Sequence, residues 1–202
     1  MASEAPLILA FDTSAAHCAA ALVSGDRVLA ARAEEMGRGQ AERLMPMLEE
    51  ILAAEGAVWR DLAALGVGIG PGNFTGVRIS VAAARGIALG LGIPAVGVTG
   101  FDACAHGEPR PLWVAIEAAR GMVYLQRHGA DTTDTPDLRT AAATEALDAP
   151  LRWLSDMAPA LLATHIARIA GERRPLPLPR PAPLYLRPAD AAPMREAPPV
   201  LL

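Results

Sequence analysis

One stretch of the sequence combines glycines, a hydroxyl side chain and an arginine in a pattern suited to holding a phosphate. It reads GIGPGNFTGVRIS over residues 68–80, after an apolar strand-like run and at the start of a helix-like run. Glycines let a backbone turn sharply and approach a ligand closely. A helix N-terminus directs free N–H groups toward anions. The chemistry indicated is anion binding by Gly70, Gly72, Thr75 and Gly76.

The known phosphate and nucleophile motifs do not match this loop. All 18 basic residues of the chain are arginines, so a P-loop lysine is missing, and the Walker spacing also fails. Asn73 and Thr75 stand where G-x-G-x-x-G requires its third glycine, and G-x-S-x-G does not occur. The residues therefore leave two interpretations open, an anion site and a structural strand-to-helix turn in which Thr75 caps the helix.

Two acidic residues follow apolar strand-like runs. Asp12-Thr13-Ser14 ends LILAFD, and Glu117 ends LWVAIE. The segments LAFDTSAAHCAAAL and VAIEAARGMVYLQ share a strand, an acid, a small-residue turn and a returning strand, which is a weak internal repeat. Paired acids across a cleft can do acid–base chemistry or hold magnesium. The alternative is a pair of strand-end turns whose acids bond to nearby backbone.

Composition narrows the class of protein. The 202 residues are 52% apolar and 20% charged, with a net charge of −4, which predicts a folded core and no global attraction to nucleic acid. Cys18 and Cys104 lie in apolar runs, typical of buried free thiols. The four histidines show no metal-binding spacing. We expect a cytoplasmic protein, because the start lacks a signal peptide and the longest uncharged run, 16 residues containing Pro94, is too short to span a membrane.

The patterning predicts an α/β protein. The expected strands are 7–14, 17–24, 27–35, 62–69, 94–98, 111–118 and 121–129, and the expected helices are 40–56, about 76–91, and a short one within 99–107. Three strands followed by alternating helices and strands are typical of a ribonuclease-H-like lobe. We expect this lobe over 1–107, a reduced second lobe over 108–174 with one or two helices in 151–174, and an extended proline-rich tail over 175–202.

The first two helices could face this protein's own sheet or another subunit. Ala82, Gly86 and Gly90 recur every fourth residue, which makes a smooth stripe that lets a second backbone approach. Both packing arrangements fit the pattern equally well. The candidate interface residues on the two helices are Leu44, Met47, Leu48, Arg78, Ala82, Arg85, Gly86 and Gly90.

The segments ILAFDTS, QAERLMPMLEEIL, GIGPGNFTGVRIS and GIPAVGV occur in this order, and together they resemble the TsaB (YeaZ) family. IEAARGMVY and PLYLRPADAA are similar to that family's second-lobe hairpin and terminal segment. The resemblance implies an actin/Hsp70-like (ASKHA, ribonuclease-H-like) two-lobed fold with a reduced second lobe. It implies a role in making threonylcarbamoyladenosine on tRNAs that read ANN codons.

The resemblance also implies partners and a lack of catalysis. Members bind the catalytic subunit TsaD through a helical bundle, and a TsaE-type ATPase joins that complex. Contact with tRNA is indirect, and homodimers of family members form through the same helices. In the catalytic paralogue an H-x-x-x-H pair binds metal, and the matching positions here are Gly100 and Cys104. We therefore expect no catalytic residues, no metal and no cofactor, apart from weak ATP or ADP binding at the partner interface.

Some residues depart from the family pattern, and two rival functions stay open. Gln40 replaces a common histidine, and Glu117 replaces the usual aspartate. Residual nucleotide or anion contacts would come from Asp12, Thr13, Ser14, Gly70, Gly72, Thr75, Gly76 and Glu117. One rival is a small ATPase or carbamoyltransferase that uses Asp12, Thr13 and Thr75. The other is a metallopeptidase, as the family's old glycoprotease label suggests.

Overall fold

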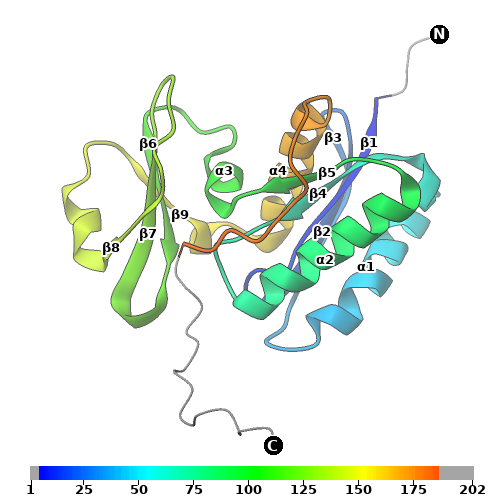
Figure 1. The fold of residues 1–202 in the computed structure, drawn as a ribbon, viewed down its shortest axis with the longest axis horizontal. Helices are drawn as coiled ribbons and strands as arrows, with labels where there is room; N and C mark the ends of the chain where they lie inside the picture. Colours follow the sequence, from blue (N-terminus) through cyan, green and yellow to red (C-terminus); the bar gives the residue numbers. More distant parts are fainter. Residues whose placement is uncertain (1–4, 187–202) are drawn as a thin grey trace, which may run out of the picture.

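The first sheet carries the predicted phosphate loop. The computed structural model describes residues 5–186, and its five-stranded sheet has the order β3-β2-β1-β4-β5 (Figure 1). The strands are β1 (Leu7–Asp12), β2 (His17–Ser24), β3 (Arg27–Glu35), β4 (Leu62–Gly68) and β5 (Ala95–Val98). β1 is antiparallel to β2 and parallel to β4. β1 and β2 are buried almost throughout, which explains why they read as continuous apolar runs rather than alternating ones.

Helices cover both faces of this sheet. α1 (Gln40–Ala54) and α2 (Phe74–Leu91) lie side by side on one face, and α4 (Pro159–Arg173) lies on the other (Figure 1). α2 begins at Asn73, whose side chain accepts a hydrogen bond from the Gly76 N–H at 2.9 Å, and it ends at Gly92 in the left-handed conformation. Asn73, and not Thr75 as expected, is therefore the N-cap.

The second sheet repeats the first in reduced form. It has the order β8-β7-β6-β9, with β6 (Leu112–Glu117), β7 (Met122–His128), β8 (Asp137–Thr140) and β9 (Leu151–Trp153). β6 is antiparallel to β7 and parallel to β9, as β1 is to β2 and β4. The expected internal repeat is thus confirmed at the level of strand pairing. The fifth strand has no counterpart here among the described residues, and the 3₁₀ turn η3 (Ala141–Ala146) stands between β8 and β9 where α1 stands between β3 and β4.

One element departs from the expected division of the chain. α4 follows the second sheet in sequence, inside the expected second lobe, but its apolar side chains pack against β1, β4 and β5. Gly66 makes this approach close, since a Cβ at this position would lie 3.0 Å from both the Ala170 Cβ and the Ile166 carbonyl oxygen. The first lobe therefore takes a covering helix from the segment expected to form the second lobe, and the boundary at 107/108 between the two sheets stays a prediction.

The segment after α4 runs back along β5 and α2 (Figure 1). Its prolines alternate over 175–183, so only every second residue carries an N–H. Leu184 donates its N–H to the Ile69 carbonyl at 2.8 Å. A proline-rich cover of this kind shields the edge strand from pairing with another chain. The end of the expected tail, 187–202, lies outside the described residues.

The position of α4 yields a stability prediction. Ile166 is 1% exposed and Leu161 is 45% exposed on the same helix. We expect Ile166→Ala to lower the free energy of unfolding by about 2–5 kcal/mol because it leaves a cavity between α4 and the sheet. Leu161→Ala should change it by less than about 0.5 kcal/mol. Urea denaturation of both variants measures the difference, and equal midpoints would contradict the packing of α4 on this sheet.

Candidate functional site: a closed turn and an open helix face

The turn after β1 satisfies its polar groups within the protein. The Asp12 Oδ1 accepts hydrogen bonds from the Ser14 N–H at 2.9 Å and the Ser14 hydroxyl at 2.8 Å, and it lies 2.8 Å from the His17 Nε2. Asp12 is 2% exposed and Thr13 is fully buried. A carboxylate with several donors at this depth is a structural anchor, as in the strand-end alternative. Sequence reasoning missed His17, although it begins the returning strand of the same hairpin.

The glycine loop packs directly on this turn. Thr13 donates its hydroxyl to the Gly76 carbonyl at 2.7 Å, and Asn73 donates its N–H to the Ser14 carbonyl at 2.6 Å. A Cβ at Gly68 would collide with the Asp12 carboxylate, and a Cβ at Gly76 would collide with the Thr13 carbonyl. These glycines therefore allow the close approach of two segments of the same chain rather than of a ligand.

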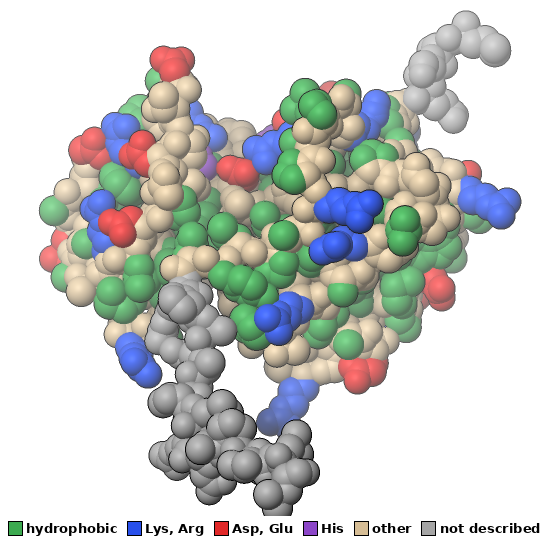
Figure 2. Space-filling model, viewed as in Figure 1, with side chains coloured by type: hydrophobic (Ala, Val, Ile, Leu, Met, Phe, Trp, Pro, Cys, Tyr) green, Lys and Arg blue, Asp and Glu red, His purple; other side chains and the backbone are tan. Residues whose placement is uncertain are grey.

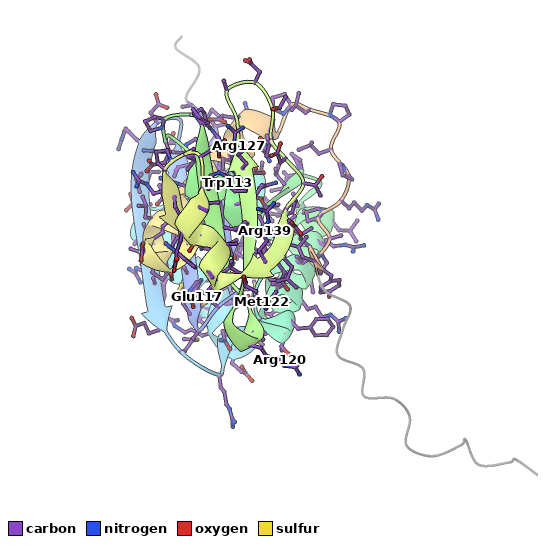
Figure 3. The ribbon with its side chains drawn as sticks, turned by 90° about the vertical axis from the view of Figure 1, so that its left-hand side faces the viewer. Trp113, Glu117, Arg120, Met122, Arg127 and Arg139 are labelled. Carbon is purple, nitrogen blue, oxygen red and sulfur yellow. The ribbon has the colours of Figure 1, made fainter. Side chains whose placement is uncertain are left out.

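The structure divides the predicted anion contacts into two groups. Asp12, Thr13, Ser14, Gly70 and Gly76 are buried, whereas Gly72, Thr75 and Glu117 are exposed. Glu117 lies with Arg120 and Met122 at the end of the β6–β7 hairpin, away from Trp113 and Arg127 at its other end (Figure 3). The two equivalent acids therefore differ, since one is closed in by hydrogen bonds and the other faces solvent.

A hollow remains beside the N-terminus of α2. It measures about 380 Å³, and its lining includes Arg38, Gln40, Glu42, Asn73 and Thr75. Arg38 and Thr75 could meet an anion, but the Glu42 carboxylate repels one. The Gly76 N–H is already used by the Asn73 side chain. The lining thus offers acceptors as well as donors, so it does not form a selective phosphate cradle.

The positions matched to the paralogue's metal ligands do not fit a metal ion. Gly100 and Cys104 are buried in α3 (Gly100–Ala105), and Cys104 belongs to an apolar cluster with Phe101, Leu112 and Val114. A Cβ at Gly100 would lie 2.9 Å from the Leu154 Cδ2. Within residues 5–186 no three His, Cys, Asp or Glu side chains gather as a ligand set. Apolar packing between the lobes fills the place that imidazoles would need.

The face of α2 that points away from the sheet is open. Ala82, Arg85, Gly86 and Gly90 are exposed, and Leu89 is 81% exposed. A Cβ at Gly86 or Gly90 would meet no atom of residues 5–186 within 4 Å. Neither a turn nor packing within this part of the chain explains these two glycines. A smooth helical stripe beside a bare leucine is typical of a surface that another helix covers.

The three candidate residues on α1 lie in the protein's own core. Leu44, Met47 and Leu48 are each 1% exposed or less and pack with Leu9 and Leu22 of the first sheet. Their helical spacing correctly indicates a buried face, but the sheet buries it. The structure therefore corrects this part of the expected interface, whose exposed members lie on α2.

Among the described residues, α2 is also the helix whose length and composition would allow it to cross a membrane. Apolar helices that pack on a sheet in soluble proteins have the same length and composition, so these properties alone do not indicate a membrane span. Only 33% of α2 is buried, with side chains such as Val77, Val81 and Ala84 against the first-lobe core. The helix is therefore more apolar than its burial within this chain requires.

A cluster at the start of α2 was not foreseen. The Arg78 guanidinium lies 3.6 Å from the centroid of the Phe74 ring, and its Nε–H donates to the Tyr185 hydroxyl at 2.8 Å. The two rings are 5.1 Å apart. Both aromatic residues lie in segments that carry the family resemblance, GPGNFTGVR and PLYLR. This resemblance was the sequence signal that could have pointed to the cluster. The cluster fixes the segment after α4 to the exposed helix.

Comparisons with known proteins show the family to which the chain belongs. A family model described as TsaD, tRNA N6-adenosine threonylcarbamoyltransferase, matches residues 32–192. An uncharacterized protein of Mycobacterium tuberculosis is 35% identical over 205 residues, covering 93% of this chain and 94% of that protein. TsaB of Escherichia coli, a tRNA threonylcarbamoyladenosine biosynthesis protein, is 38% identical over 129 residues, covering 61% of this chain and 55% of that protein.

The chain belongs to the TsaB/YeaZ family. It spans little more than half the length of the Escherichia coli member. The structure of YeaZ from Pseudomonas aeruginosa superposes with a TM-score of 0.69 at 23% identity and covers 90% of this chain and all of that one. This likeness confirms the expected two-lobed α/β fold. The family assignment expected from the motifs is confirmed as well.

The contact between the turn and the loop can be tested by adding one methyl group. We expect Gly68→Ala to lower the free energy of unfolding by about 1–3 kcal/mol, because the new Cβ collides with the Asp12 carboxylate. Gly90→Ala, in an open helical position, should raise it by about 0.5–1 kcal/mol. Chemical denaturation compares the two, and a neutral Gly68→Ala would show that the loop does not rest on the turn.

Thiol reactivity tests the burial of the matched ligand position. Burial, followed by the charge of nearby acids, raises the pKa of both Cys18 and Cys104 to about 11. Only the thiolate reacts, so at pH 8 roughly one thiol in a thousand is ionised. We expect no reaction of the native protein with a disulfide reagent at pH 8, and two equivalents in urea. If one thiol of the native protein reacts rapidly and this reaction is absent in Cys104→Ser, Cys104 becomes a candidate nucleophile again.

Proposed function

We propose that this chain is a non-catalytic subunit of tRNA threonylcarbamoyladenosine biosynthesis, which binds and activates a TsaD-type threonylcarbamoyltransferase through the exposed face of α2. The open stripe formed by Ala82, Gly86 and Gly90 is the observation that carries this proposal, because nothing in the described chain covers it. The names of the curated relatives supply the pathway.

The turn after β1 and the positions matched to metal ligands support a role without catalysis. Asp12 and Thr13 are bonded within the chain, and the positions that match metal ligands lie in an apolar cluster. The Asp12 Oδ1 and the Thr13 hydroxyl, oxygens that a phosphate-binding enzyme could direct at magnesium, are thus engaged within the chain. The chain keeps the fold of an ASKHA enzyme and uses its outer helix for docking.

The assembly follows from the same surface. A stable complex of standard size buries about 1,600 Å² in total, so α2 would be joined by the exposed parts of neighbouring elements. A TsaE-type ATPase then joins this pair, and tRNA meets the catalytic subunit rather than this one. In the absence of the partner, a second copy of the chain would cover the same face. The complex would work in the cytoplasm with its tRNA substrate.

The test places a long charged side chain on the stripe. Ala82→Arg and Gly86→Arg should weaken binding to the TsaD-type subunit of the same organism by at least about 30-fold, because close backbone approach is lost at the centre of the interface. Titration calorimetry gives the dissociation constant, and circular dichroism verifies the fold. Reconstituted tRNA modification should fall in parallel.

The matched control is Ala142→Arg, the same substitution at an exposed site on η3 of the second lobe. It should bind and activate as the unchanged chain does. The proposal fails if Ala82→Arg and Gly86→Arg assemble normally. It also fails if the isolated chain turns over ATP with a metal ion and loses that activity in Asp12→Ala.

A further inference from the structure

A groove beside the C-terminal half of α2 is basic and apolar at once. It measures about 480 Å³ and lies between α2, the start of β5 and residues 174–181. Among residues 5–186, the charged side chains that line it are Arg85, Arg174 and Arg180, and none of the lining residues is acidic. Basic and hydrophobic side chains lie next to one another over this face (Figure 2). The groove therefore presents positive charge without an internal counter-charge.

These arginines have no partner in the described part of the chain. The salt bridges there involve other arginines, such as Arg43 and Arg173. The Nε of Arg174 is buried and has no hydrogen-bond acceptor among the described residues. A carboxylate is the group that best pairs with guanidinium groups that lack a partner in the chain.

A purely structural explanation accounts for part of this arrangement. Arg174 is the C-cap residue of α4, where the helix dipole attracts a cation. Arg85 and Arg180 have no such reason, since one lies in the middle of α2 and the other in the proline-rich segment. Dipole attraction also leaves the Arg174 Nε–H unpaired. Arg85 and Arg180 are exposed, so their charges are solvated in the free chain and accessible to a carboxylate ligand.

The walls of the groove specify the rest of the ligand. Leu89, Leu176 and Leu178 are 81%, 56% and 41% exposed and flank the arginines. The lining holds no aromatic residue on which a nucleobase could stack. Gly86 leaves space for a backbone to come close. These features fit a polypeptide whose leucine-like side chains alternate with carboxylates.

We propose that this groove binds an acidic, leucine-containing segment of a partner protein, with Arg85, Arg174 and Arg180 pairing its carboxylates. The inference rests on the proposed function in one respect, that α2 is the side of the molecule that meets a partner. It adds the chemistry of the partner segment. Pro179 and Pro181 hold the outer wall in a fixed backbone, which lowers the cost of ordering the groove on binding.

The test uses the full chain and the labelled peptide Ac-Glu-Leu-Glu-Asp-Leu-Glu-amide, with its Gln/Asn counterpart as the neutral probe. Fluorescence anisotropy gives the affinity, and the Arg174 Nε–Hε resonance reports the site. We expect the acidic peptide to bind at least about 10-fold more tightly than the neutral one at low salt, and to weaken as salt screens the charges. Arg180→Glu and, separately, Arg174→Gln should each remove most of this preference.

The control is Arg120→Glu, an exposed charge reversal on the second lobe, which should leave the affinity unchanged. Equal binding of the two peptides, no measurable binding of the acidic one, or equal losses in Arg180→Glu and Arg120→Glu would each overturn the proposal. So would displacement of the peptide by equimolar inorganic phosphate, which indicates a simple anion site. Binding that occurs only after removal of residues 187–202 would assign the groove to the chain's own segment.

The peptide experiment also separates this proposal from the proposed function. Ala82→Arg should abolish assembly with the TsaD-type subunit but keep peptide binding, because Ala82 does not line the groove. Normal assembly of that variant, with peptide binding intact, would remove the proposed docking mode alone. Loss of assembly in Ala82→Arg, with no peptide preference in the unchanged chain, would remove the groove proposal alone.

Discussion

The close contact between the turn after β1 and the glycine loop is the constraint on which the first lobe depends. Two hydrogen bonds join them, from Thr13 to the Gly76 carbonyl and from Asn73 to the Ser14 carbonyl. The loop can lie this near only because glycines remove the side chains that would meet the turn. The same contact sets where α2 begins, since Asn73 is both a partner of the turn and the N-cap of the helix.

This constraint supports the proposal that the chain keeps the form of a nucleotide enzyme without performing its chemistry. A phosphate loop needs free N–H groups and an open space, whereas here the Gly76 N–H and the Asp12 carboxylate are bonded inside the protein. The metal positions are likewise lost to apolar packing between the lobes. What stays open is the outer face of α2, held at its start by the Phe74–Arg78–Tyr185 cluster and bordered at its end by the arginine groove. The proposed role in binding a partner rests on this exposed surface.

Local patterns predicted most elements of the fold but not how distant segments meet. Periodicity identified α1 as a helix with a buried stripe, yet a stripe of leucine and methionine looks the same whether a sheet or a partner covers it. β9 has three residues, too few for an alternating pattern to emerge. α4 was expected as a helix, but its alanine-rich face does not indicate which of the two sheets it covers. Tyr185 and Arg78 lie 107 residues apart, and only the folded chain brings them together.

Hydrogen–deuterium exchange of this chain, alone and with the TsaD-type subunit, tests the central claim most directly. The account predicts that complex formation slows exchange along the exposed part of α2, residues 78–90, and beside it in 174–181. It predicts no change at residues 12–14, which are already protected by their own hydrogen bonds in the free chain. Fast exchange at 12–14 in the free chain, slowed by ATP or by the partner while α2 stays unchanged, would contradict it.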